Sequence, residues 1–283
     1  MSELIIPKER EFGWELKPDS SVYYGRVTNK SGQECVVLEH SLIRGITTEM
    51  LTWWFDYFPN LEVTLDDIPG YEGKKVSVYY LWHPSDHIAV WLSGELGPNN
   101  CSKVGAKLHI QEVMQAKKYG LKYKVDNAME IFYHENDGWA MGIADAALGK
   151  MMTLRICYKD VYDGKDIIGV HYHYEVVIGT NKTGETAENM NKKIMESFSP
   201  SFWDAWLTHN AIEVGVFENF LPAIYEQRND LTNLHYAKHM NSVTESPKKL
   251  RGFNQSLFDS RLKGYKESED AFIFQGITEK SFL

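Results

Sequence analysis

The sequence predicts an α+β fold in which a curved antiparallel sheet wraps around a long helix in the C-terminal part. Between about residues 75 and 180, several segments have strand-like composition and are bounded by Gly, Asn, Asp and Pro. One apolar segment, residues 201–227, follows them and is long enough for a helix. Consecutive strands followed by such a helix favour a sheet that curls around it and encloses a cavity.

Composition and charge narrow the class of protein. The 283 residues suffice for one large domain, and a net charge of −9 argues against nucleic-acid binding. No segment is apolar enough to cross a membrane, the N-terminus lacks a signal-peptide pattern, and the three cysteines are scattered. We therefore expect a cytoplasmic protein that contacts neither nucleic acid nor membrane. An aromatic content of 13% suggests an aromatic-lined cavity or a large interface.

The N-terminal region, residues 1–65, is expected to be partly helical. A helix over residues 49–58 would be capped by Thr47 or Thr48 and stopped by Pro59. Two Trp and two Phe are a heavy apolar load for so short a helix. Such a helix packs on a core or on a partner subunit.

The remaining elements follow in order. Strands are expected over residues 76–82, 88–92, 106–112, 128–133, 153–158 and 167–178, with a hairpin turn at Asp163 and Gly164. A polar helix over 185–198 precedes the apolar helix, which Pro222 should kink. Residues 228–283 are polar and expected to be irregular.

His209 and Glu213 lie four residues apart on the apolar helix and therefore point the same way. Taken alone, they suggest an ordinary hydrogen-bonded pair. The apolar surroundings make a carboxylate costly unless its charge is compensated. A convergent imidazole and carboxylate can supply half of a metal site, and we interpret them so.

Three further groups carry unusual polar residues. His83 precedes a proline that forces it into an extended backbone, with Asp86 and His87 close behind; the alternative is a turn in which Asp86 caps the backbone. Glu112 ends an apolar strand face, where it reaches the rim or is buried with a partner. The last group shares one face of a later strand and consists of His171, His173 and Glu175.

This last group permits a rival reading. Two histidines two residues apart on a strand can chelate one metal, as in cupins, which would suggest a non-haem iron oxygenase. A polar sheet face without a metal is the alternative.

The order and approximate separations of four motifs resemble the zinc-dependent carbon–carbon hydrolases typified by diacetylphloroglucinol hydrolase and phloretin hydrolase. The resemblance extends over about residues 35–225, and its motifs are Trp53-Trp54-Phe55, His83-Pro84 with Asp86 and His87, Glu112, and His209-x-x-x-Glu213. It implies a Bet v1-like cup, with residues 1–65 as a helical dimerisation region and 66–283 as the catalytic domain with a polar tail. It also implies a homodimer.

The resemblance further implies one Zn²⁺ per chain, held by His83, Glu112, His209 and Glu213, with His87 as the competing first ligand. The metal would activate water for attack on an aryl ketone. The substrate would be an acylphloroglucinol or phloretin-type compound, cleaved to a carboxylic acid and the deacylated phenol. A non-catalytic Bet v1-like binder of aromatic ligands is a further alternative.

The substrate shell departs from the family pattern. The family places a histidine on the strand before the last hairpin, where this chain has Arg155, Cys157 and Tyr158. We therefore expect His173, or else His171, to transfer the proton, because imidazole titrates near neutral pH. The expected contacts to phenol oxygens are Asp86, Tyr79, Tyr158 and Tyr172.

Overall fold

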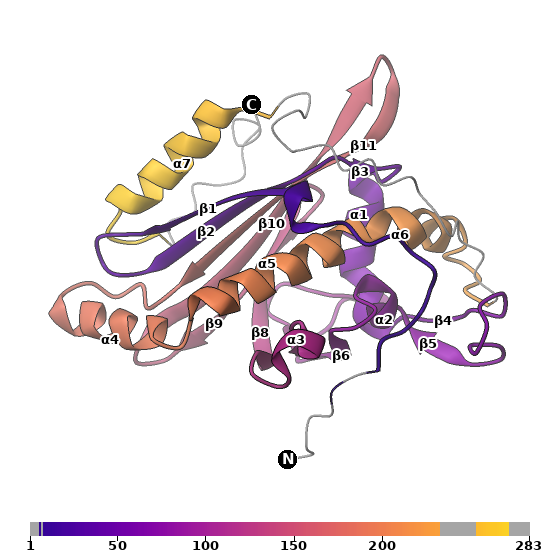
Figure 1. Cartoon of the computed structure of the whole chain (residues 1–283), viewed down its shortest axis with the longest axis horizontal. Helices are drawn as coiled ribbons and strands as arrows, with labels where there is room; N and C mark the ends of the chain where they lie inside the picture. The colour runs from indigo at the N-terminus through magenta and orange to yellow at the C-terminus, as the bar shows by residue number, and fades with distance from the viewer. Residues whose placement is uncertain (1–5, 7, 233–252, 272–283) are drawn as a thin grey trace.

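The computed structural model of the chain describes residues 6, 8–232 and 253–271 (Figure 1). Its strands are β1 (Val22–Thr28), β2 (Glu34–His40), β3 (Ile43–Arg44), β4 (Glu62–Thr64), β5 (Lys75–Ser77), β6 (His87–Ser93), β7 (Lys107–Val113), β8 (Lys124–Glu135), β9 (Gly138–Asp145), β10 (Gly149–Asp163) and β11 (Asp166–Ile178). The helices are α1 (Thr48–Tyr57), α2 (Val78–Trp82), α3 (Ala116–Tyr119), α4 (Glu185–Met195), α5 (Pro200–Gly215), α6 (Phe217–Glu226) and α7 (Gln255–Glu267), with 3₁₀ turns η1 (Asp19–Ser21), η2 (Phe58–Asn60) and η3 (Pro98–Asn100).

Nine strands form one antiparallel sheet in the order β1-β2-β11-β10-β9-β8-β7-β6, with β3 paired to β11. Strands β6 to β11 are neighbours both in sequence and in the sheet, so they form a meander. The predicted α+β class with a large antiparallel sheet is confirmed. Strands from both sides of the expected boundary at residue 65 belong to one sheet, because β1, β2 and β3 pair into the same sheet as β6 to β11. Dimerisation of this region stays a prediction.

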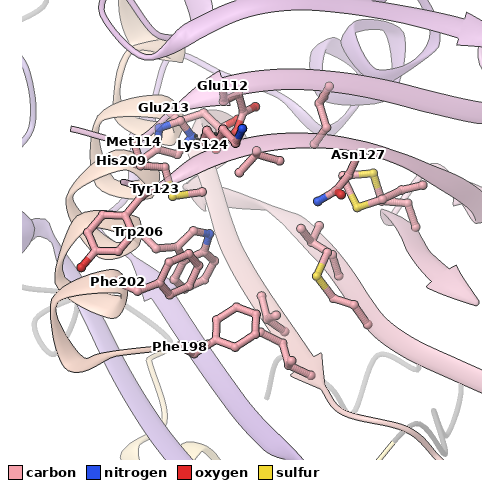
Figure 2. A pocket seen from close by; sticks show the side chains of 18 of the residues that line it. Glu112, Met114, Tyr123, Lys124, Asn127, Phe198, Phe202, Trp206, His209 and Glu213 are labelled. Atoms are coloured by element: carbon pink, nitrogen blue, oxygen red, sulfur yellow. Dashed lines mark ion pairs between the residues drawn. The ribbon is translucent and has the colours of Figure 1, made fainter. Parts of the chain in front are cut away.

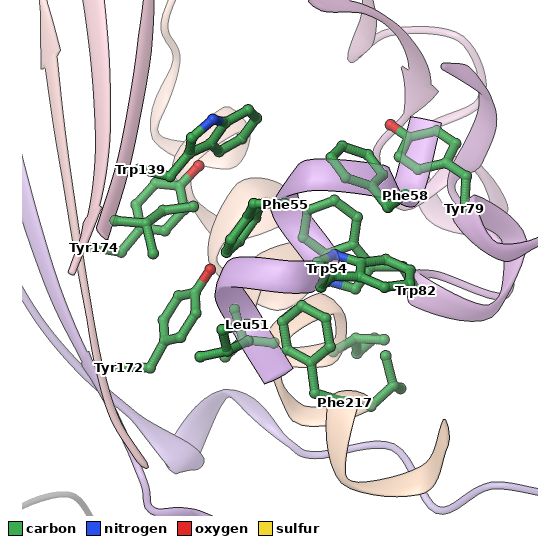
Figure 3. Close-up of a cluster of buried hydrophobic side chains, with 14 of the residues drawn as sticks. Leu51, Trp54, Phe55, Phe58, Tyr79, Trp82, Trp139, Tyr172, Tyr174 and Phe217 are labelled. Carbon is green, nitrogen blue, oxygen red and sulfur yellow. The ribbon is translucent and has the colours of Figure 1, made fainter. Parts of the chain in front are cut away.

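Helix α1 begins where its sequence predicts. The Thr47 side chain accepts a hydrogen bond from the Met50 backbone N–H, which satisfies a donor of the first turn. The aromatic residues of this helix serve the chain's own core (Figure 3). Phe55 stacks on Trp139 at 4.8 Å between ring centroids, and Trp54 packs edge-on against Phe217. Much of its apolar load is thus buried within the chain.

The predicted strand over residues 76–82 is wrong after its first residues. The chain leaves β5 at Ser77, whose side chain accepts a hydrogen bond from the Tyr79 backbone N–H and caps the short helix α2. The residues of α2 are apolar and mostly buried. A short apolar run is compatible with a buried strand or with a helical turn. Here the Ser77 cap favours the helical turn.

The long apolar helix is divided in two. The break lies at Val216, between α5 and α6, and Pro222 lies inside α6. Lys17 crosses the helix just before the break: a Cβ on Gly215 would lie 2.7 Å from the Lys17 side chain. Lys17 then forms a buried ion pair with Glu218 in the first turn of α6. Glycine at 215 thus makes room for the buried lysine.

The polar C-terminal part is not wholly irregular, because α7 packs against β1 and β2 on the side of the sheet away from α5 (Figure 1). A Cβ on Gly25 of β1 would clash with Leu262 Cδ1, so glycine at this position lets α7 lie close to the strand. The rest of the expected tail, residues 233–252 and 272–283, lies outside the described residues. Within the described ranges, no helix has the length and hydropathy needed to span a bilayer.

The three thiols should differ sharply in reactivity. Burial raises the pKa of Cys35 and of Cys157 to about 12, so neither forms appreciable thiolate at pH 8. Cys101 is only partly buried. We expect a thiol-specific disulfide reagent to modify one equivalent rapidly in folded protein and three after denaturation. Rapid modification of all three thiols in folded protein would contradict the burial of Cys35 and Cys157.

Candidate metal centre

Four buried side chains from three elements converge at one end of the sheet. His87 opens β6, Glu112 lies directly opposite it on β7, and His209 and Glu213 come from α5. Their ligand atoms all lie within 4.8 Å of one another. Figure 2 shows Glu112, His209 and Glu213 together at one side of a cavity. Glu112 is thus buried with partners rather than placed at the rim.

The spacing of these ligand atoms suits a metal ion. His87 Nε2 lies 3.5 Å from a Glu112 oxygen and 3.6 Å from a Glu213 oxygen. His209 Nε2 lies 3.7 Å and 3.9 Å from the other oxygens of the same two residues. Four ligands at ordinary Zn–N and Zn–O distances in a tetrahedron lie about 3.3–3.4 Å apart. His87 Nε2 is also buried without a hydrogen-bond partner among the described residues.

Both imidazoles are oriented by bonds to their other nitrogen. His87 Nδ1 lies 2.7 Å from the Tyr79 carbonyl oxygen, and His209 Nδ1 lies 3.0 Å from Asp86 Oδ2. Each acceptor favours a proton on Nδ1, so that the neutral ring presents the lone pair of Nε2 to the two glutamates. This is the outer arrangement expected of metal-ligating histidines.

Both carboxylates are held as well. The Tyr79 hydroxyl donates a short hydrogen bond to Glu112 Oε1. The Asn210 amide donates to Glu213 Oε2 at 3.3 Å, and its oxygen faces His40 Nε2 at 2.9 Å. Each of the four candidate ligands therefore has a partner that fixes its orientation.

The electrostatics of the cluster favour a cation. Burial lowers the pKa of His87 to about 3, so this imidazole is neutral at pH 7. Burial also raises the pKa of Glu213 to about 7. Burial lowers the pKa of His209, but the hydrogen bond to Asp86 and the nearby carboxylates outweigh it and raise this pKa to about 9. Without a metal, His209 and part of the Glu213 population therefore hold protons at pH 7, and a divalent cation would displace these protons on binding.

The expected first ligand, His83, is not part of this group, and its competitor His87 is; His83 instead forms a second buried group of metal-ligand spacing with Asp86 and His209. In the turn after Pro84, His83 Nδ1 accepts hydrogen bonds from the backbone N–H groups of Ser85 and Asp86. The proton of the neutral ring therefore lies on Nε2, which faces Asp86 Oδ2 at 3.5 Å. The His83 ring stacks on His209 with centroids 4.5 Å apart, behind the cluster.

Asp86, for which a contact with a phenol oxygen was expected, lies behind the cluster and not on the cavity wall. Besides His209, its carboxylate accepts the Gln115 backbone N–H at 2.9 Å. Asp86 therefore both caps a backbone N–H group, as expected for a turn, and orients the candidate ligand His209. His83 and the hydrogen bond from His209 lower the pKa of Asp86, against the effect of burial.

A cavity of about 530 Å³ lies between α5 and the inner face of the sheet, with Glu112, His209 and Glu213 in its wall. Most of the lining is apolar or aromatic, with four methionines and several aromatic rings (Figure 2). Such a volume suits a small organic ligand. The cluster is therefore placed where it can reach a bound molecule.

Of the three tyrosines expected in the substrate shell, only Tyr79 lines this cavity. Tyr158 lies against α1, with its hydroxyl 3.1 Å from Thr52 Oγ1, and Tyr172 packs edge-on against His40. Sequence reasoning missed Tyr174, which lines the cavity next to Trp206. Tyr174 lies two residues after Tyr172 on the same strand face, so the alternation that selected Tyr172 could also have selected Tyr174.

The histidines expected to transfer a proton lie on the other face of the sheet. His173 Nδ1 lies 2.5 Å from Glu39 Oε1, and its Nε2 lies 2.9 Å from Glu175 Oε1. Arg261 of α7 contacts the same ring. His171 shares this outer face, because alternate residues of a strand point the same way. Neither histidine lines the cavity, so the structure does not bring either of them to the cluster.

The cupin-like arrangement is also not formed. His171, His173 and Glu175 do share one face, as expected, but the chain surrounds His173 with carboxylates and a guanidinium. Among the described residues, no group with metal-ligand spacing contains any of the three. Arg261 would repel a cation at this position.

Comparison with known proteins does not identify a family for this chain. No protein-family model and no curated protein matches the chain. One similar solved structure is SA2116, a protein of unknown function from Staphylococcus aureus: 10% identity, 66% of this chain and 94% of that chain covered, TM-score 0.33. Another is Ara h 8.0201, which is 11% identical; the match covers 70% of this chain and 97% of that chain, with a TM-score of 0.30. The expectation of a hydrolase therefore rests on the motif order and on the site itself.

Proposed function

We propose that this protein is a zinc-dependent hydrolase that cleaves the carbon–carbon bond between an acyl group and a polyhydroxylated aromatic ring. The observation that carries the proposal is the buried group of two histidines and two glutamates in the wall of an apolar cavity. Nitrogen and oxygen ligands of this kind suit Zn²⁺, and two carboxylates neutralise its charge. The motif order supports the same reaction.

The chain's residues have distinct roles in this proposal. His87, Glu112, His209 and Glu213 would hold the Zn²⁺, which when bound lowers the pKa of water and polarises a ketone carbonyl. In the overall reaction the water hydroxyl joins the acyl carbon, the bond to the ring breaks, and the ring carbon gains a proton. The products are a carboxylic acid and the deacylated phenol.

Tyr174 is the group best placed to orient the substrate. Its hydroxyl has no hydrogen-bond partner among the described residues, although the side chain is almost fully buried in the cavity wall. Burial and the charges of Glu213 and Glu112 raise the pKa of Tyr174 well above its ordinary value. The hydroxyl therefore stays protonated and can donate to a ketone or phenol oxygen. Tyr79 lines the same end, but its proton is already directed at Glu112.

The proposed reaction can be tested directly. Zinc-loaded protein is incubated with monoacetylphloroglucinol, diacetylphloroglucinol and phloretin, and mass spectrometry follows the released acid and phenol. We expect both products in equal amounts without consumption of dioxygen, and none after chelator treatment. Dioxygen consumption would favour an oxygenase, and zinc-loaded protein that releases no acid from any ketone would refute the hydrolase.

The apolar cavity also favours a second candidate, a non-catalytic binder of aromatic ligands. Tight binding of these compounds with no turnover in the presence of zinc would support it. A homodimer and a cytoplasmic location remain predictions from the sequence and can be tested by sedimentation and by cell fractionation.

Asp86 offers a test of the outer arrangement. Asp86→Asn should weaken zinc binding by about 10–100-fold, because His209 would lose the carboxylate that orients it. Competition with a chelating dye measures the change in Kd. Asp126→Asn, on the exposed surface of β8, is the matched control and should leave Kd unchanged. Equal affinity in the Asp86 variant and the control would show that this carboxylate does not support the site.

A further inference from the structure

The cavity extends well beyond the four-residue cluster. Phe202, Trp206, His209 and Glu213 all line it, and their spacing places them on one face of α5. Phe202 and Glu213 lie about three turns apart, or about 16 Å along the helix axis. The cluster lies at one end of this face (Figure 2). The rest of the cavity forms an arm that runs toward the start of α5.

The opposite wall of the arm has a similar length and an apolar surface. On β11 the lining residues run from Tyr174 to Ile178, about 13 Å of strand. From β9 to β11, every described lining residue is apolar or aromatic. The groups farthest along this wall are Met141, Met152, Leu154, Val176 and Ile178. This wall offers no partner for a hydroxyl or a charge beyond Tyr174.

Polar lining residues occur beside the cluster and also on or just before β8 and next to the start of α5, where they are Lys122, Tyr123, Lys124, Asn127, Glu196, Ser197 and Ser199. Tyr79 and Tyr174 line the cavity beside the cluster, close to Glu112 and Glu213. A hydroxylated ring packed against the wall from β9 to β11 would leave its hydroxyls on that side unpaired, which is costly. The ring therefore belongs at the cluster, and the part of the ligand on the other side of the carbonyl belongs in the arm.

We propose that the substrate carries an unbranched aliphatic acyl chain of medium length, which lies along α5 while its carbonyl reaches the cluster; this rests on the proposed function. The four methionines of the cavity wall support a flexible chain, since their unbranched side chains adapt to ligands of irregular shape. Each methylene that enters the arm should raise kcat/KM about fourfold until the arm is full.

The test uses zinc-loaded protein and the acetyl, butanoyl, hexanoyl and octanoyl derivatives of phloroglucinol, with phloretin as the compound whose tail ends in a phenol. We expect kcat/KM to rise steeply from acetyl to hexanoyl, and the octanoyl compound to exceed phloretin. A flat or falling series, or a preference for phloretin over octanoyl, would overturn the inference and leave the proposed hydrolysis intact.

A binding series separates the inference from the reaction. Calorimetric titration with acetate, butanoate, hexanoate and octanoate should show Kd tightening about fourfold per methylene. If no ketone releases acid but this series holds, the proposed function fails and the aliphatic arm stands. Length-independent binding would overturn the arm.

Two variants locate the chain. Leu154→Trp and Met152→Trp add bulk within the arm, so the ratio of octanoyl to acetyl kcat/KM, or of the corresponding binding constants, should fall at least tenfold. Ile168→Trp adds similar bulk at the exposed tip of the β10–β11 hairpin and should retain the wild-type ratio. Thermal unfolding identifies folded variants, and Met152 is the more tolerant site because it is only partly buried. An unchanged ratio in a folded arm variant would contradict the placement.

Discussion

Alanine at His87 is expected to abolish stoichiometric zinc binding, whereas alanine at His83 should leave it in place. His87 Nε2 faces both glutamates, and removing it would leave three ligands. His83 Nδ1 accepts backbone N–H groups, its Nε2 faces Asp86, and it does not belong to the group that contains both glutamates. Metal analysis after dialysis should find about one zinc per chain in His83→Ala protein and almost none in His87→Ala protein.

The two variants control for each other because both remove a fully buried imidazole. Circular dichroism establishes that each folds. Turnover should vanish with the metal in His87→Ala protein, and His83→Ala protein should keep measurable turnover. Retention of zinc by His87→Ala protein together with its loss from His83→Ala protein would restore His83 as the ligand.

Removing either partner of the Lys17–Glu218 ion pair should cost about 3–5 kcal/mol of stability. The two charges are 2.5 Å apart, and their side chains are 3% and 2% exposed. Glu218 also accepts the Arg44 backbone N–H at 2.8 Å. Lys17→Met would leave a buried carboxylate without its cation, and Glu218→Leu a buried ammonium without its anion. Urea unfolding at constant m-value measures the loss.

The double variant Lys17→Met with Glu218→Leu should recover most of that loss, because well-packed apolar residues often replace a buried ion pair without cost. The exposed pair Lys75 and Glu62 provides the surface control, and its disruption should not change stability measurably. If both single variants at the buried pair lost no more stability than this control, the prediction would be wrong, and the pair would have to be accessible to water.

Three of the four candidate ligands could be placed from local patterns. Helical spacing places His209 and Glu213 on one face, and alternation places Glu112 with Leu108 and Ile110. The structure confirms both geometries, because these residues share the cavity wall. Periodicity sufficed here because each pattern lies within one regular element.

The remaining assignments depended on information that spacing lacks. Alternation places His173 with Glu175 but does not say which sheet face is concave, and the polar residues face outward under α7. The choice between His83 and His87 depends on a turn in which backbone N–H groups occupy one imidazole nitrogen. The role of Asp86 depends on α5, which is more than a hundred residues away in sequence.

The sheet order has a consequence for how the protein folds. Strands β6 to β11 pair with their neighbours in sequence, whereas β2 joins β11 through pairs such as Glu39 and His173, 134 positions apart. Closing a loop of that size costs chain entropy before any contact repays it. We therefore expect the meander to form first and β1–β2 to dock in a slower step. His87 and Glu112 would meet early, and a cation would bind tightly only after α5 arrives, so that metal capture marks a late stage of folding.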